Sequence, residues 1–157
     1  ASELPSALVA AYAYGPVAVI ESYLEGTEIA VTVLDEGDGP VALPAVEIRP
    51  ESGVYDYESR YTAGATRFVT PAELDDDVLT AAGGLAVAAH RALGLRDISR
   101  IDVMVVESRP YFLEGNVAPG MTETSLAPLA MEADGTDVGH VYAQLVDRAS
   151  ARAEGRG

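Results

Sequence analysis

Apolar residues recur at helical spacing in three stretches of the chain, and each stretch predicts a helix. The first is alanine-rich and covers residues 4–14, where Gly15-Pro16 ends it because proline cannot continue a helix. The second follows Thr70-Pro71-Ala72-Glu73, which has the form of a capping box with proline at the first helical position, and runs to about Leu93. The third covers residues 137–152, whose apolar side chains share one face: Val138, Val141, Leu145 and Ala149.

Shorter β-branched and apolar runs between these helices predict strands. We expect them at residues 17–23, 27–34, 41–48, 101–106 and 110–114. A tight turn near Ser108-Arg109 joins the last two strands into a hairpin. Residues 49–70 lack periodicity and are rich in tyrosine, which is typical of a functional loop, so we expect residues 52–70 to be the least ordered part of the chain.

The pattern as a whole predicts an α+β fold, a mostly antiparallel sheet with flanking helices. With 157 residues and 48% hydrophobic content, the chain is long enough to bury a core. Its longest apolar runs are far shorter than the roughly 18 to 20 residues that span a bilayer, so we expect no membrane span. The chain begins at Ala1 without a signal-peptide pattern, so we expect it to be cut from a longer protein, and the absence of cysteine favours a reducing, cytoplasmic location.

The charge of the chain argues against nucleic acid as a partner. The chain has 25 acidic and 10 basic residues, and its formal net charge is -15. Every basic residue is arginine, because the sequence contains no lysine. Nucleic-acid binding needs a basic surface that releases counterions. A phosphorylated ligand would therefore depend on metal ions or on a few placed arginines for positive charge.

The predicted hairpin carries the candidate metal ligands. If its turn lies near residue 108, Asp102 and Glu114 are opposite each other, and Asn116 shares the face of Glu114 because strand side chains alternate. Facing carboxylates repel unless one is protonated or a cation lies between them. Oxygen ligands without histidine or cysteine favour magnesium or manganese. The alternative, a solvated sheet face, stays open on spacing alone.

The residues after the hairpin predict an anion site. Pro119-Gly120 forms a turn that leads into a helix start at Ser125, where backbone N–H groups and a hydroxyl suit a carboxylate or an oxyanion. A simple helix cap explains Ser125 equally well on its own. The proximity to the metal ligands favours the anion site.

The order of these motifs resembles the D-alanine:D-alanine ligase family of ATP-grasp enzymes. The resemblance rests on Glu-x-Asn followed by Pro-Gly-Met-Thr-x-x-Ser-Leu, preceded by Arg-Ile-Asp and by the tyrosine-rich residues 55–61, and it extends from Ile20 to about Leu145. It implies that residues 1–157 are the C-terminal part of such a ligase, without the N-terminal domain and the front half of the ATP site. The fragment by itself is then expected to be inactive.

The resemblance also implies residues for ATP. Glu21 and Leu24 would lie on the hinge whose backbone recognises the adenine, and Glu28 would bind the ribose hydroxyls. Leu113 would lie under the base. Arg60 stands where the family usually has a lysine that reaches the γ-phosphate, and arginine is not a neutral replacement for it.

The metal and substrate residues follow in the same way. Asp102, Glu114 and Asn116 would hold two magnesium or manganese ions, while Arg100 and the Gly120 N–H would face the oxyanion of the reaction.

For the second D-alanine, the resemblance implies that Ser125 and the Leu126 N–H would hold its carboxylate. Tyr61 would belong to a loop that closes over the site. A second departure from the family lies on either side of Asn116. The family prefers a β-branched residue where Gly115 stands and threonine where Val117 stands, and the glycine is expected to loosen the strand.

The implied function is ATP-dependent ligation of two D-alanines for peptidoglycan, and so for cell-wall synthesis and cell shape, by a cytoplasmic enzyme that is a homodimer in its full-length form. Three alternatives remain: another ATP-grasp carboxylate–amine ligase, a catalytically dead nucleotide-binding module, and a purely structural acidic domain. The structural domain is the least favoured because it leaves Asp102, Glu114 and Asn116 unexplained.

Overall fold

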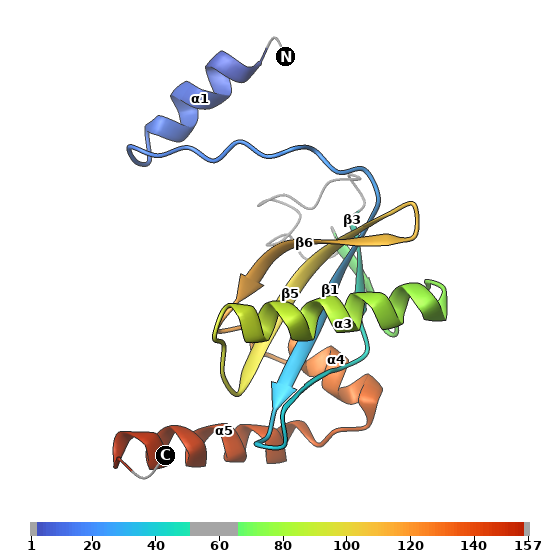
Figure 1. Cartoon of the computed structure of the whole chain (residues 1–157), viewed down its shortest axis with the longest axis vertical. Helices are drawn as coiled ribbons and strands as arrows, with labels where there is room; N and C mark the ends of the chain where they lie inside the picture. Colours follow the sequence, from blue (N-terminus) through green and yellow to red (C-terminus); the bar gives the residue numbers. More distant parts are fainter. Residues whose placement is uncertain (1–2, 51–65, 156–157) are drawn as a thin grey trace.

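A computed structural model describes residues 3–50 and 66–155. Within this part, a sheet lies between α3 on one side and α4 with α5 on the other, while α1 stands apart at the end of an extended segment (Figure 1). The elements, in chain order, are α1 (Leu4–Tyr12), β1 (Thr27–Asp35), β2 (Pro40–Ala42), β3 (Val46–Pro50), β4 (Thr66–Val69), α3 (Asp76–Ala92), β5 (Ile98–Val106), β6 (Arg109–Asn116), α4 (Leu126–Asp134) and α5 (Val138–Ala153).

The sheet confirms the predicted α+β class. Its strands follow the order β4-β3-β1-β5-β6, and β2 pairs with the end of β1 that β3 leaves open. All of these pairings are antiparallel. None of the helices within residues 3–50 and 66–155 is long and apolar enough to cross a bilayer.

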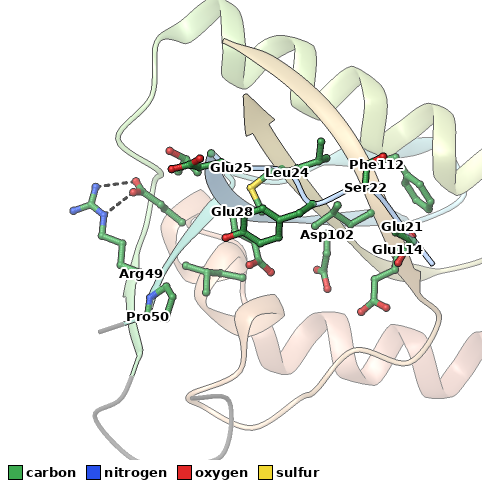
Figure 2. A pocket seen from close by; sticks show the side chains of 17 residues that line it. Glu21, Ser22, Leu24, Glu25, Glu28, Arg49, Pro50, Asp102, Phe112 and Glu114 are labelled. Carbon is green, nitrogen blue, oxygen red and sulfur yellow. Dashed lines mark hydrogen bonds and ion pairs between the residues drawn. The ribbon is translucent and has the colours of Figure 1, made fainter. Parts of the chain in front are cut away.

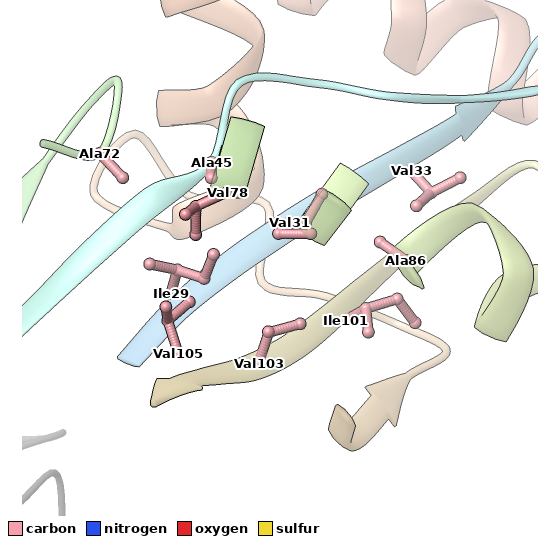
Figure 3. Packing of buried hydrophobic residues seen from close by; sticks show 11 residues of the cluster. Ile29, Val31, Val33, Ala45, Ala72, Val78, Ala86, Ile101, Val103 and Val105 are labelled. Carbon is pink, nitrogen blue, oxygen red and sulfur yellow. The ribbon is translucent and has the colours of Figure 1, made fainter. Parts of the chain in front are cut away.

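β1 is the central strand, and it is buried on both faces. Ile29, Val31 and Val33 point toward α3, where they pack with alternate residues of β5 and with small residues of the helix (Figure 3). Ala30 and Leu34 point the other way, toward α4 and α5. A strand covered on both faces must be apolar at successive positions, which explains why residues 29–31 do not alternate with polar residues.

Two strand predictions were wrong. Residues 17–23 form no strand, and Val17 and Val19 are largely exposed, because no described strand lies alongside to pair with them. Residues 41–48 are not one strand but two, since Pro44 lies in the break between β2 and β3 and has no N–H to give to a ladder.

The start of α3 also differs from the prediction. The helix begins at Asp76 rather than at Pro71, and the predicted capping box does not form. The Glu73 carboxylate bonds instead to Arg49, at 2.8 Å, and the Glu73 backbone N–H donates to Glu47. Long-range partners on β3 thus take the groups that a local cap would have used.

The predicted loop at residues 49–70 is shorter than expected because β4 occupies its end and pairs with β3. Residues 51–65 lie outside the described residues. The prediction of low order, and the predicted roles of Arg60 and Tyr61, therefore stay predictions.

α5 begins as predicted, at a cap made by Asp137. The Asp137 carboxylate accepts a hydrogen bond from the backbone N–H of His140, at 3.0 Å. We expect Asp137→Ala to lower the free energy of unfolding by about 1 kcal/mol, measured by urea denaturation. The matched control is Asp75→Ala, because Asp75 caps α3 without a side-chain hydrogen bond and should cost less.

A buried histidine makes the stability of the fold depend on pH. His90 of α3 is only 2% exposed; its Nδ1 lies 2.8 Å from the Ser99 hydroxyl, and its Nε2 has no hydrogen-bond partner within the described part of the chain. Burial lowers the pKa of His90, with Asp35 and Asp97 acting against this and Arg91 adding to it. The folded protein therefore disfavours the protonated imidazole.

The sign of the pH effect follows from this direction. Because the pKa of His90 is lower in the folded state than the value of about 6.5 in the unfolded chain, the unfolded state binds the proton first. Stability should be full above pH ~6.5 and fall below it, by at most about 1.4 kcal/mol per pH unit. Urea denaturation at pH values above and below 6.5 should show this fall in the free energy of unfolding in the unchanged chain and in His140→Gln, which changes an exposed histidine. The fall should be absent in His90→Gln. An unchanged slope in His90→Gln would contradict this assignment.

Candidate active site

The β5–β6 hairpin brings the three predicted metal ligands to one face. Its turn consists of Glu107 and Ser108, both with positive φ, one position earlier than predicted. Asp102 is directly opposite Glu114, as predicted, although the earlier turn alone would put it opposite Leu113; a register shift in β6 restores the predicted pair. Asn116 is opposite Arg100, two positions further along the same strands, so that the four side chains share a face. Figure 2 shows the Asp102 and Glu114 carboxylates pointing the same way.

Asp102 has a cation partner that the sequence analysis did not assign to it. Its side chain is 5% exposed, and each of its two oxygens accepts a hydrogen bond from the Arg100 guanidinium, from Nε at 2.7 Å and from Nη2 at 2.8 Å. Residues two apart on a strand lie on the same face, so the period of two was a signal that could have revealed this pair. Glu114, in contrast, is exposed.

A bulge in β6 shapes the wall of a pocket next to these residues. Between the pairs Asp102–Glu114 and Val103–Phe112 the register shifts, which leaves Leu113 as the extra residue. A bulge bends its strand and redirects side chains. As a result, three consecutive residues of β6, from Phe112 to Glu114, line one pocket.

The pocket has a volume of about 1070 Å³ and lies between the hairpin, the end of β3 and the segment that leads into β1. It gathers several residues that the resemblance implied for ATP and metal: Glu21, Leu24, Glu28, Leu113, Asp102 and Glu114. It is also lined by Phe112, Met104 and Arg49, which the sequence analysis missed. The period of two could not have found Phe112, because the register shift between Phe112 and Glu114 breaks the alternation of side chains.

Arg49 lies at the opposite end of the pocket from Glu114 (Figure 2), and two carboxylates hold its guanidinium. Its guanidinium bonds to Glu47 and to Glu73, and these hydrogen bonds raise the pKa of Arg49 above its ordinary value. The bond to Arg49 in turn lowers the pKa of Glu73. Glu47 is buried and also accepts the Glu73 N–H, at 3.0 Å. This cluster fixes the end of β3 where it borders the pocket.

Gly115, between Glu114 and Asn116, is packed rather than open. A Cβ at this position would come within 2.9 Å of Leu93 Cδ1 and 3.5 Å of Ile101 Cδ1. Side chains from the end of α3 and from β5 thus occupy the space of the missing side chain. This packing acts against the loosening expected from Gly115, which stays a prediction.

The predicted anion site forms a separate turn after β6. Ser125 is the N-cap residue of α4. Its hydroxyl oxygen accepts a hydrogen bond from the Thr122 backbone N–H at 3.2 Å and lies 2.8 Å from the Thr122 hydroxyl oxygen. A Cβ on Gly120 would come within 2.7 Å of the Ser125 Oγ, so glycine is required for this close approach. The Tyr142 hydroxyl of α5 donates to the Met121 carbonyl at 2.7 Å, and burial raises the pKa of Tyr142.

The donor set on the hairpin fits a hard divalent cation. It consists of two carboxylates and one amide oxygen on one face, and Asp102 is fixed in place by Arg100. Magnesium and manganese prefer such oxygen ligands. No group of three or more histidine, cysteine, aspartate or glutamate side chains in the described residues is arranged to hold a metal, so Asn116 would have to complete the set.

The sequence profile of the family described as D-ala D-ala ligase C-terminus matches residues 1–148. The chain belongs to this family. A D-alanine–D-alanine ligase of Gloeobacter violaceus is 43% identical over 150 residues, which cover 94% of this chain and 48% of that protein. A D-alanine–D-alanine ligase of Pelotomaculum thermopropionicum is 39% identical over 148 residues, which cover 94% of this chain and 46% of that protein.

Solved structures confirm the D-ala D-ala ligase fold. A D-alanine–D-alanine ligase of Bacillus anthracis complexed with ATP superposes with a TM-score of 0.79 at 26% identity, over 99% of this chain and 49% of that one. The VanG D-Ala:D-Ser ligase of Enterococcus faecalis gives a TM-score of 0.81 at 28% identity, over 94% of this chain and 43% of that one. The chain thus spans about half the length of the relatives that it matches.

Proposed function

We propose that this chain supplies the C-terminal half of an ATP-dependent D-alanine–D-alanine ligase. The observation that carries the proposal is the register of the β5–β6 hairpin, which puts Asp102, Glu114 and Asn116 on one face beside a pocket large enough for a nucleotide. The family and the ATP complex of the Bacillus anthracis relative support ATP as the ligand. The rest of the ATP-binding cleft would come from the half of the ligase that this chain does not cover in its relatives.

In the proposed reaction, the γ-phosphoryl group of ATP passes to the carboxylate of one D-alanine and leaves ADP and an acyl phosphate. The amine of a second D-alanine then attacks the acyl carbon, the C–N bond forms, and inorganic phosphate and a proton leave. The protein mainly positions the reactants and neutralises charge, as phosphoryl transfer requires. The dipeptide would serve peptidoglycan synthesis in the cytoplasm, and the complete enzyme would be a homodimer.

The nucleotide would occupy the pocket. The backbone at Glu21 and Leu24 would recognise the adenine, Glu28 would bond to the ribose, and Leu113 would lie under the base. Outside the described residues, Arg60 would reach the γ-phosphate and Tyr61 would belong to the closing loop.

The hairpin would hold two magnesium ions, or manganese, on Asp102, Glu114 and Asn116. When bound, these ions would neutralise negative charge on the phosphate oxygens. Arg100 and the Gly120 N–H would face the oxyanion that develops at the acyl carbon.

The turn before α4 would hold the second amino acid. Ser125 stands at the N-terminus of the helix, and the Leu126 N–H is among the first N–H groups of that helix. Such groups bind a carboxylate well because the N-terminal end of a helix carries partial positive charge. The contacts of Ser125 with Thr122 and of Tyr142 with Met121 hold this turn in shape.

A second candidate is a ligase that adds a different second amino acid. The similarity to the VanG D-Ala:D-Ser ligase favours it, because that structure covers 94% of this chain at a TM-score close to those of the D-alanine ligases. The same hairpin and pocket would serve either reaction.

A chimera tests the proposal. The chain would replace the matching 150 residues of the Gloeobacter violaceus relative, and the purified protein would be incubated with ATP, magnesium and either D-alanine alone or D-alanine with D-serine. We expect D-alanyl-D-alanine and ADP in equal amounts, and no product from the 157-residue chain alone. A mixed dipeptide as the main product would favour the second candidate. A folded chimera that neither hydrolyses ATP nor makes a dipeptide would favour the catalytically dead module.

A further inference from the structure

Asp102 would be an unusual metal ligand because its negative charge is already paired with a guanidinium. Both oxygens of this buried carboxylate accept hydrogen bonds from the Arg100 guanidinium, at 2.7 and 2.8 Å. Only 11% of the Arg100 side chain and 5% of the Asp102 side chain are exposed, so little water screens the pair. Such two-pronged pairs between arginine and a carboxylate are among the stronger charge-assisted contacts in proteins.

A divalent cation at the hairpin would use the same carboxylate. Asp102 and Glu114 are directly opposite each other, so a cation that joins them must contact an Asp102 oxygen, each of which already accepts a bond from Arg100. The cation and the guanidinium would then be close together with little water between them, and like charges repel strongly under these conditions. This repulsion, rather than a lack of lone pairs on the carboxylate, would weaken the bonds of Arg100 to Asp102 when a cation binds.

We propose that Arg100 and the divalent cation compete for Asp102, so that cation binding loosens the guanidinium from this carboxylate and turns it toward an anionic group in the pocket. This inference rests on the proposed function, from which it takes the metal site. In the metal-free protein, Arg100 keeps the buried carboxylate neutralised and in position. In the loaded protein, the same arginine becomes available to the oxyanion. One residue thus links the filling of the metal site to the completion of the anion site.

The first experiment measures cation affinity in the 157-residue chain with Mn²⁺ as the probe. The broadening of backbone amide signals near Asp102 in an NMR titration gives Kd even when binding is weak. We expect Arg100→Gln to lower the Kd for Mn²⁺ about tenfold, because a positive charge beside the site is removed. The charge-matched control is Arg109→Gln, at the far end of the hairpin, where the guanidinium lies 5.4 Å from the Tyr111 ring; its Kd should not change.

The second experiment uses the unchanged chain, so its result does not depend on whether an Arg100 variant folds. In the unchanged chain, the Nε–H signal of Arg100 reports the bond to Asp102, and diamagnetic Mg²⁺ can be added without broadening it. We expect this signal to move with the same midpoint as the backbone amides of Asp102 and Glu114. A signal that stays fixed while those amides move would overturn the competition.

The outcomes separate the inference from the function on which it rests. Binding of Mn²⁺ with an equal or higher Kd in Arg100→Gln overturns the competition and leaves the proposed metal site intact. No effect of either ion on the amides near Asp102, up to concentrations that bind any carboxylate pair, overturns the metal site and the inference together. A lower Kd in Arg100→Gln, with a moving Nε–H signal in the unchanged chain, supports both.

Discussion

Asp102→Asn in the chimera with the Gloeobacter violaceus relative is expected to lower kcat/KM for ligation by at least about 10³-fold. Asparagine keeps the shape of the side chain but removes the charge that pairs with Arg100 and that would bind the proposed cation. Loss of metal-based charge stabilisation amounts to several kcal/mol, and each 1.36 kcal/mol is a factor of about ten in rate. The measurement is the initial rate of dipeptide formation as a function of D-alanine concentration.

Two controls accompany this variant. Asp147→Asn makes the same chemical change at an exposed position of α5 and should leave kcat/KM unchanged. Ser125→Ala should instead raise the KM for the second amino acid with little change in kcat, because its hydroxyl would hold a carboxylate that does not react. Activity of Asp102→Asn within tenfold of the unchanged chimera would show that Asp102 holds no essential cation.

Ile29→Ala is expected to lower the free energy of unfolding of the chain by about 2–5 kcal/mol. Ile29 lies on the central strand β1, is 0% exposed, and packs between β5 and α3 (Figure 3). Truncation would leave a cavity that the strand cannot close, since β1 is bonded to a neighbour on each side. Urea denaturation, followed by circular dichroism, gives the change.

The control for this prediction uses the same substitution at an exposed site. Ile20 is 68% exposed in the segment that leads to β1, so Ile20→Ala should change the free energy of unfolding by no more than about 0.5 kcal/mol. Equal losses in the two variants would mean that the segment at Ile20 is packed in solution and that the exposed apolar residues there have a partner.

The sequence by itself determined the features that depend on local spacing. The alternation of side chains along a strand put Asn116 on the face of Glu114, and the structure has both residues on that face, opposite Arg100 and Asp102. The start of α5 at Asp137 follows from a short-range hydrogen bond between a side chain and a backbone N–H three residues later. Such features need no information from distant parts of the chain.

Tertiary structure decided the features that depend on distant partners. Residues 17–23 are apolar enough for a strand but have no described neighbour to pair with. α3 begins at Asp76 because Glu73 bonds to Glu47 of β3, which is 26 residues away in the sequence. The bulge at Leu113 is a change in the pairing of β6 with β5. It lets three consecutive residues of β6 line one pocket. A strand pair, a bulge and a competing hydrogen bond each depend on which segments meet. Local propensity cannot determine this, because the free energy of each contact is gained only once the sheet has formed.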